Sequence, residues 1–431
     1  MTRKERRELK KDKSLICALY NIIIKYFPKL LTMFENLTVQ RQKGKVTYNM
    51  KVICVTRLFG LLCGITTMNS LTNKFNNDFT IDTIAKITNS DLTDLPHYDT
   101  INDVFDDLDI YEIRKIQKYI AYSLIRSKMF DKFRYNGKFQ LLIDGTGLVS
   151  FNYKHCDHCL VKKHSDGHMT YEHQVLEAKL VFDSFVLSID SEFIENPNPD
   201  VINIKKQDCE MNAFKRMAIR LKKKFPKLKF IITGDALYAS GPFIKLCLDN
   251  KWDYIFRLKS DKLRTVNQDF DGLISIDSGT THKDYFLVKD YVYQKYEFNI
   301  IRFIETVEKK DDKIFTFITS LNVSNNNIKK LIDMGRRRWK IENCGFKNQK
   351  HILFDITHMS SLDYNAMKAH YLFIQFAHAI RQLLDFGSSF VELFQGKLKE
   401  ISFAILNELI STPVNLIINT NFQLRFDKLI I

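Results

Sequence analysis

The chain has 431 residues, which is too long for one ordinary domain and enough for two or three. Its hydrophobic fraction of 45% is that of a globular protein, so most of the chain should bury a core. Because 65 Lys and Arg outnumber 50 Asp and Glu, the formal net charge is +15, which favours a polyanionic partner such as nucleic acid. A basic surface that binds no polyanion is the alternative that charge alone leaves open.

Three features argue against a secreted or membrane protein. Residues 1–13 are a run of charges without the apolar core of a signal peptide. The longest apolar segment, residues 52–68, contains Arg57 and is too short to span a bilayer. The eight cysteines are scattered along the chain, which disfavours a disulfide scaffold. We therefore expect a reduced, cytoplasmic compartment, with no membrane partner.

Residues 1–134 are predicted to form a helical N-terminal region. Apolar residues recur at helix period over residues 111–130. Before them, residues 95–100 (Leu-Pro-His-Tyr-Asp-Thr) are expected to form a loop that leads into a helix capped by Thr100 or Asn102.

From residue 138 onward the pattern changes to strands. Strands are predicted at residues 139–143, 174–182, 185–193, 228–233 and 252–258, with helices at 205–225 and 240–250. Three successive strands followed by alternating helix and strand predict a mixed sheet covered by helices. Residues 260–325 interrupt this alternation with Tyr- and Phe-rich β segments at roughly 285–293, 296–307 and 313–320. Helical character returns at Asn327 and continues through residues 364–384.

Two apolar runs each lead to an aspartate next to a glycine, and a helix with a glutamate follows far downstream. The first run ends at Asp144-Gly145, the second at Gly234-Asp235, and the helix carries Glu342. A strand that ends in aspartate places its carboxylate at the carboxyl edge of the sheet, where open sheets put their sites. Glycine beside it lets the backbone come close to a bulky ligand.

Three converging carboxylates beside a basic surface are what a two-metal phosphodiester enzyme requires. Carboxylate oxygens suit Mg²⁺, and two such ions about 4 Å apart activate the attacking oxygen and stabilise the departing one. The alternative is that Asp144 and Asp235 each begin a turn, and that Glu342 makes a surface ion pair with Arg338 four residues earlier.

Asp144, Asp235 and the run Arg338-Trp339-Lys340-Ile341-Glu342 resemble the DDE triad and the Tyr-Arg-Glu-Lys signature of insertion-sequence-4-type transposases. The order agrees, and so does the long gap between Asp235 and Glu342, where such transposases carry a β-strand insertion within a ribonuclease-H-like fold. Further phrases that resemble these transposases lie at residues 95–100, 206–210 and 235–239, so that the similarity covers most of residues 90–385.

The resemblance implies an enzyme that cuts the ends of its own insertion sequence and joins them to target DNA. Asp144, Asp235 and Glu342 would hold two Mg²⁺ or Mn²⁺ ions, with water and then a freed 3′-hydroxyl as nucleophile. Arg338 would contact a DNA phosphate near the scissile bond. The predicted DNA-binding residues are Arg337, Arg338, Trp339, Lys340, Lys347 and Lys350. The implied partners are double-stranded DNA, as terminal inverted repeats and as target, and a second copy in a homodimer on paired ends. The bound protein would be associated with the bacterial nucleoid.

The implied fold is α/β, with a ribonuclease-H-like mixed sheet flanked by helices, a β-rich insertion and a helical N-terminal region. The domains would be residues 1–134 for binding DNA ends, 135–259 and 326–385 for the two parts of the catalytic domain, 260–325 for the insertion, and 386–431 for a tail that is a candidate for dimerisation.

The chain departs from the family signature at two positions. Seven residues before Glu342 the pattern has a tyrosine, and this chain has Gly335. The uninterrupted count to the signature lysine reaches Gln349, and Lys350 matches only with one residue inserted. On an α-helical wheel Gln349 stays on the face of Glu342, whereas Lys350 is rotated by about 80°.

A cluster of histidines and cysteines follows the first strand. His155-Cys156-Asp157-His158-Cys159 is followed by His164, His168 and His173. Because Cys-x₂-Cys with nearby histidines has structural zinc spacing, the cluster is a candidate Zn²⁺ site with Cys156, Cys159, His164 and His168 as ligands. Such a site would stiffen the loop beside Asp144. A polar hairpin loop without metal is the alternative.

Basic stretches at residues 3–13, 205–229 and 336–350 are expected to follow DNA phosphates, although a solvated surface is the default for any one of them. Two other functions remain open. One is a nuclease of the same fold that hydrolyses DNA without strand transfer, and the other is a catalytically inactive DNA-binding relic.

Overall fold

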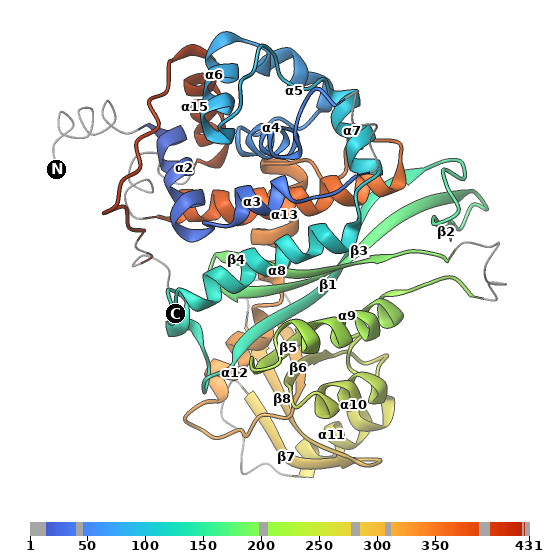
Figure 1. The fold of residues 1–431 in the computed structure, drawn as a ribbon. Coiled ribbons are helices and arrows are strands. Elements are labelled where there is room, and N and C mark those ends of the chain that lie inside the picture. Colours follow the sequence, from blue (N-terminus) through green and yellow to red (C-terminus); the bar gives the residue numbers. More distant parts are fainter. Residues whose placement is uncertain are drawn as a thin grey trace.

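The computed structural model describes residues 14–39, 46–197, 206–276, 285–306, 312–387, 397–424 and 426. The basic stretch 3–13, residue 205 and the start of the apolar tail near residue 390 lie outside this part. Within it, one mixed sheet is flanked by helices, with a helical region formed by the N-terminal residues, so the predicted fold class is confirmed (Figure 1).

The sheet has nine strands in the described part of the chain. They are β1 (Phe139–Phe151), β2 (Leu160–Lys163), β3 (Met169–Phe182), β4 (Phe185–Ile194), β5 (Phe230–Gly234), β6 (Asp253–Leu258), β7 (Tyr285–Tyr293), β8 (Tyr296–Glu305) and β9 (Lys313–Thr319). The order is β2-β3-β1-β5-β6-β9-β8-β7, and β4 also pairs with β3. Strands β1, β5 and β6 run parallel, and all other neighbours pair antiparallel.

The predicted β insertion extends the central sheet. Strand β9 pairs with β6 from Ile255↔Thr319 to Leu258↔Thr316, and β8 and β7 follow outward. The three predicted strands are therefore confirmed, but as one edge of the same sheet. A helix before them, α11 (Arg264–Ile276), was not predicted. Only Val266 and Phe270 of its first eight residues are buried, which is too short an apolar pattern to reveal a helix.

The helices fall into two groups along the chain. The N-terminal ones are α2 (Leu15–Tyr26), α3 (Leu30–Glu35), α4 (Met50–Leu62), α5 (Met68–Phe75), α6 (Asp78–Thr88), α7 (Tyr98–Asp106) and α8 (Ile110–Arg126). The later ones are α9 (Glu210–Lys224), α10 (Gly241–Asp249), α11, α12 (Ile328–Arg336), α13 (Tyr364–Phe386) and α15 (Leu398–Ser411). Across the described residues, none of these helices combines the length and hydropathy that a membrane span needs.

Helix α13 joins the N-terminal helices to the sheet. It contacts α2, α4, α7 and α8 as well as strand β4, and it runs between these two layers in Figure 1. Its buried polar side chains have partners inside the fold: Arg381 donates to the carbonyl oxygen of Leu62 at 2.8 Å, and Gln382 bonds the main chain of Val186. One continuous hydrophobic core therefore extends from the N-terminal helices to the sheet.

The C-terminal helix α15 packs within the chain, against α2 and α6. The Glu408 carboxylate accepts hydrogen bonds from the Ser14 hydroxyl and from the main-chain N–H of Leu15. The apolar face of this helix is thus used inside the molecule, and dimerisation through the tail stays a prediction.

A loop does lead into α7, but it ends at His97, so residues 98–100 of the predicted loop are helical and the predicted cap is wrong. His97 is the N-cap, and its Nδ1 accepts a hydrogen bond from the main-chain N–H of Asp99 at 3.3 Å. The predicted caps Thr100 and Asn102 lie inside the helix. Asn102 instead bonds the buried Nε2 of His370, because α7 packs against α13.

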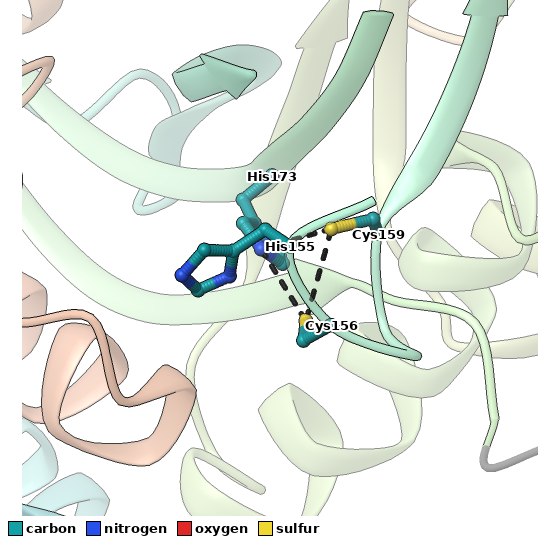
Figure 2. Close-up of side chains that lie close together, drawn as sticks. All are labelled: His155, Cys156, Cys159 and His173. Atoms are coloured by element: carbon teal, nitrogen blue, oxygen red, sulfur yellow. Dashed lines mark hydrogen bonds between the residues drawn. The ribbon is translucent and has the colours of Figure 1, made fainter. Parts of the chain in front are cut away.

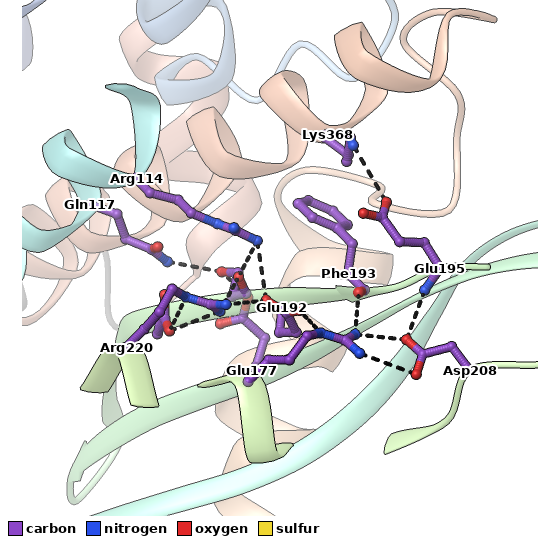
Figure 3. Close-up of polar contacts among 12 residues, drawn as sticks. Arg114, Gln117, Glu177, Glu192, Phe193, Glu195, Asp208, Arg220 and Lys368 are labelled. Atoms are coloured by element: carbon purple, nitrogen blue, oxygen red, sulfur yellow. Dashed lines mark hydrogen bonds and ion pairs between the residues drawn. The ribbon is translucent and has the colours of Figure 1, made fainter. Parts of the chain in front are cut away.

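Helix α9 is basic, but part of its charge is neutralised inside the fold. Arg220 and Lys224 pair with the fully buried Asp190 of β4 at 3.0 and 2.7 Å. Arg216 and Arg220 both pair with Glu192, which Arg114 of α8 also approaches (Figure 3). The basic residues of this predicted phosphate-binding run that remain exposed are Lys206, Lys215, Arg216, Lys222, Lys223, Lys227 and Lys229, of which Arg216 is ion-paired.

Candidate active site

Asp144 and Asp235 lie on neighbouring parallel strands. The last register pair of β1 and β5 is Leu142↔Thr233, so both aspartates stand two residues beyond it. Adjacent strands are about 4.8 Å apart, which places the two side chains next to each other. The predicted end of the first strand at residue 143 is wrong, because β1 continues to pair with β3 at Asp144↔Glu177 and beyond. Strand β5 does end, at Gly234, one residue before Asp235.

Glu342 reaches Asp144 through a shared arginine. The Arg338 Nη1 donates to Asp144 Oδ2 at 3.1 Å and to Glu342 Oε1 at 3.2 Å. The ion pair that was the alternative explanation of Glu342 therefore exists, but the same guanidinium also binds the aspartate of β1. The Asp144 side chain is 15% exposed and that of Glu342 is 54% exposed, so the site opens to solvent on the side of Glu342.

Negative charge accumulates around Asp144. Desolvation raises the pKa of Asp144 to about 7, and the charges of Glu210, Glu342 and Asp235 act in the same direction, against Arg338. Desolvation also raises the pKa of Glu210, with the charge of Asp235 as the second cause. Carboxylates held this close repel one another, and a bound cation would relieve the repulsion.

Glu210 is a fourth carboxylate of this site that sequence reasoning missed. It is the first residue of α9, and a Cβ at Gly145 would lie 2.3 Å from its Oε1. Its Oε2 accepts a hydrogen bond from the Tyr238 hydroxyl at 3.3 Å. The phrase 206–210, which resembles the transposases, ends in Glu210 and was the available signal, but an acidic residue in the first turn of a helix is common for reasons of the helix dipole, so no role was assigned to it.

The glycines of the site make room for protein side chains. We expected Gly145 and Gly234 to admit a ligand, but the Glu210 carboxylate covers the first and the Tyr238 ring lies 2.6 Å from a Cβ at the second. The departure at Gly335 also has a steric cause. A Cβ there would lie 2.7 Å from the buried Phe317 ring, which leaves no room for the tyrosine of the family pattern.

The segment that carries Glu342 is π-helical, in η3 (Ile341–Phe346) and η4 (Asn348–Ile352). Because i→i+5 hydrogen bonds widen each turn, the α-helical wheel assigns its faces wrongly. Gln349, predicted on the face of Glu342, is fully buried and bonds Gln375 and His378 at 2.9 Å. π-Helical turns are frequent at functional sites.

The predicted DNA-binding residues have different environments. Lys340 pairs with Asp183 at 2.8 Å, and Arg338 is held by the carboxylates. Lys350 is partly buried in an open pocket between the π-helical segment, α5 and α15. Trp339 is 46% exposed, Lys347 is exposed and Arg337 is partly exposed.

In the structure the two predicted cysteine ligands lie with His155 and His173, and not with the predicted His164 and His168. The potential ligands that lie together in the described part of the chain are His155, Cys156, Cys159 and His173 (Figure 2). His164 and His168 instead stack on each other in the β2–β3 turn, with ring centroids 4.1 Å apart. The hairpin holds these two rings at its tip, whereas His173 points from β3 into the protein and is 1% exposed.

Part of the chain matches a known protein family. Residues 203–380 match the family model of the transposase DDE domain. The matched stretch includes Asp235, Glu342 and Glu210 and begins after Asp144, so it is narrower than the span 90–385 expected from the resemblance.

One solved structure to which the chain is similar is the cryo-EM structure of the piggyBac transposase synaptic complex with hairpin DNA. It is 11% identical in sequence, covers 95% of this chain and 82% of that chain, and gives a TM-score of 0.45. No curated protein matches the chain.

The donor set of the site suits a hard divalent cation. Asp144, Asp235, Glu342 and Glu210 offer carboxylate oxygens, which Mg²⁺ and Mn²⁺ prefer over softer ligands. The Arg338 guanidinium already lies between two of these carboxylates, so a positive charge is accommodated there.

Proposed function

We propose that the chain is a DDE transposase of the insertion-sequence-4 type, which cuts the ends of its own element and joins them to target DNA. The observation that carries this proposal is the Arg338 bridge between Asp144 of β1 and Glu342 of the π-helical segment, beside Asp235 at the end of β5. The match of residues 203–380 to the transposase DDE domain supports it independently of that geometry.

Asp144, Asp235 and Glu342 would hold two divalent ions, Mg²⁺ or Mn²⁺. Such a pair would activate the attacking oxygen and stabilise the departing one. Arg338 has a second task in this proposal: its guanidinium lies beside the carboxylates, where it would bind the phosphate next to the scissile bond. Glu210 packs on Gly145 and accepts a hydrogen bond from Tyr238, and it would add a further negative charge beside the proposed metal ligands.

The DNA would lie over the exposed residues near Glu342. Trp339, Lys347 and Arg337 are accessible for this, and Lys350 would bind where its pocket opens. Contacts to phosphates position a duplex without reading its sequence, so recognition of the terminal repeats falls to residues 1–134 in this proposal. Paired ends would require a homodimer, acting in the cytoplasm on the nucleoid.

The test is excision from a plasmid that carries the natural flanking DNA of this gene. Wild type, Asp144→Ala and Glu342→Ala would be compared with Mg²⁺, and the donor junctions and target joints sequenced. Asp333→Ala is a matched control, because Asp333 is an exposed carboxylate of α12 outside the site.

Defined ends and joined products from wild type and the control alone are the expected result. Scattered nicks that depend on Asp144 and Glu342, without joining, would favour the nuclease. Equal amounts of product from wild type and both site variants would mean that the carboxylates are not catalytic. The absence of cleavage by all three would favour the relic.

A further inference from the structure

We propose that His155, Cys156, Cys159 and His173 bind one structural Zn²⁺ ion at the far end of the β1–β3 pair. This ligand set differs from the one that the sequence suggested, since the two histidines come from before the Cys-x₂-Cys motif and from strand β3. The inference does not rest on the proposed transposase function, because the cluster lies outside the carboxylate site.

The distances within the cluster are those of a tetrahedral zinc site. The Sγ atoms of Cys156 and Cys159 are 3.7 Å apart, and His173 Nε2 lies 3.5 and 3.4 Å from them. With zinc bonds of about 2.3 Å to sulfur and about 2.0 Å to nitrogen, a tetrahedron has edges of about 3.8 Å between sulfurs and about 3.5 Å between sulfur and nitrogen. Three donors thus already occupy three corners of one tetrahedron.

A disulfide does not explain this arrangement. The two sulfurs are 3.7 Å apart, whereas a disulfide bond is about 2.05 Å long. Both cysteines are free thiols. Two thiolates and two imidazoles in a tetrahedron select zinc over the hard cations that suit the carboxylate site.

His155 completes the set from the other side. The candidate ligand atoms of the four residues all lie within 4.8 Å of one another. The His155 ring stacks on Phe151 at 4.3 Å, and its buried Nδ1 has no hydrogen-bond partner among the described residues. His155 would supply the fourth ligand in this proposal, and a bond through Nδ1 would break no hydrogen bond among the described residues.

The His173 ring faces the two sulfurs with its Nε2 atom. This imidazole is 1% exposed, its Nδ1 has no hydrogen-bond partner in the described part of the chain, and its Nε2 contacts the two sulfurs. Sulfur is a weak hydrogen-bond partner, so a bond to zinc would stabilise the buried Nε2 more than its contacts with the two thiols do. The Tyr364 ring of α13 stacks on it at 4.5 Å and fixes its plane.

The ion would fix the segment that leads to Glu210. The carbonyl oxygen of Cys159 accepts a hydrogen bond from Asn196 Nδ2 at 2.7 Å, and Asn196 Oδ1 accepts one from the main-chain N–H of Asp208 at 3.0 Å. Asp208 stands two residues before Glu210, the first residue of α9. A closed zinc site would therefore hold both β1 and the start of α9 in place without touching the carboxylates.

The first measurement is the zinc content of the full chain, purified without a histidine tag or chelator. We expect about one zinc per chain by mass spectrometry of the elements, released when a mercurial reagent blocks the thiols. X-ray absorption at the zinc edge should show two sulfur and two nitrogen neighbours at about 2.3 and 2.0 Å. These measurements on wild type require no variant to fold.

Variants then distinguish the two ligand sets. Cys159→Ser and His173→Ala should lose the zinc, whereas His164→Ala and His168→Ala, the matched controls, should retain it. Asp144→Ala should also retain it, which separates this site from the carboxylates. A wild-type chain that contains no zinc and takes up neither Zn²⁺ nor Co²⁺ would overturn the proposal, as would a Cys156–Cys159 disulfide or loss of zinc in the His164 and His168 controls.

Discussion

At the scale of single residues, Arg338 decides how the candidate site is held together. Among the described carboxylate–arginine pairs of the site, the Arg338 guanidinium alone contacts both β1, at Asp144, and the π-helical segment, at Glu342. It neutralises two carboxylates here, and in the proposed reaction it would bind a phosphate. A residue that stabilises developing charge in this way typically contributes about a hundredfold or more in rate.

We expect Arg338→Ala to lower the rate of DNA cleavage by about a hundredfold. Arg338→Lys keeps the charge but not the forked geometry, so it should recover only part of the rate. The measurement is single-turnover cleavage of an end-containing duplex at saturating Mg²⁺, with thermal unfolding to verify the fold. Cleavage by Arg338→Ala at the wild-type rate would show that the bridge is only structural.

Glu210 is predicted to affect metal affinity. Glu210→Gln keeps the size that Gly145 accommodates and removes a charge that acts on Asp144. The Mg²⁺ concentration for half-maximal cleavage should rise by about tenfold, the usual effect of a residue next to metal ligands. Glu112→Gln, in an exposed ion pair with Lys115 on α8, is the control and should leave the Mg²⁺ dependence unchanged. An identical Mg²⁺ titration for both variants would exclude Glu210 from the site.

Sequence alone could propose Asp144, Asp235 and Glu342 as site candidates, because apolar runs and a family signature surround them. It noted the phrase that ends in Glu210 but could not place this residue beside Asp144, because that depends on how α9 packs on Gly145, and it could not choose between the histidines around Cys156. Both depend on contacts between residues distant in sequence. The predicted ligands His164 and His168 lie near the cysteines in the sequence, but in the hairpin their rings stack on each other and lie outside the cluster.

At the scale of elements, strands and helices were predicted well where their apolar pattern was long. The three strands of the β insertion agree within a few residues, and their common sheet with β6 was not foreseen because pairing between distant strands leaves no local trace. The wrong face for Gln349 has another cause. The wheel assumes an α-helix, and the backbone is π-helical there.

Gly335 in α12 tests the fit between that helix and β9. Alanine normally stabilises a helix relative to glycine by about 1 kcal/mol. At Gly335 the added Cβ would instead meet the buried Phe317 ring, and overpacking typically costs about 1–3 kcal/mol. We therefore expect Gly335→Ala to reduce the free energy of unfolding in urea. Gly147→Ala, where a Cβ would meet nothing within 4 Å, is the matched control and should change it little. A more stable Gly335→Ala variant would contradict this packing.

At the scale of the whole molecule, buried charges fasten the helices to the sheet. Asp190 of β4 is fully buried between Arg220 and Lys224 of α9. Removing one partner of a buried ion pair typically costs about 3–5 kcal/mol, because the other charges stay buried. We expect that loss of unfolding free energy for Asp190→Ala, and less than about 1 kcal/mol for Asp249→Ala, which breaks an exposed pair with Lys245. Equal effects of the two variants in urea denaturation would mean that the network is not desolvated.

The shared core predicts that the proposed domains do not fold separately. Helix α13 is buried on one side by the sheet and on the other by α2, α4, α7 and α8, so residues 135–431 alone would expose an apolar helix face. We expect this fragment to bind a hydrophobic dye and to unfold without a cooperative transition, as states that lack fixed packing do. Co-expression with residues 1–134 should restore the cooperative unfolding of the full chain, because it returns the helices that cover α13. A soluble fragment 135–431 with a sharp transition of its own would instead establish the N-terminal helices as an independent domain.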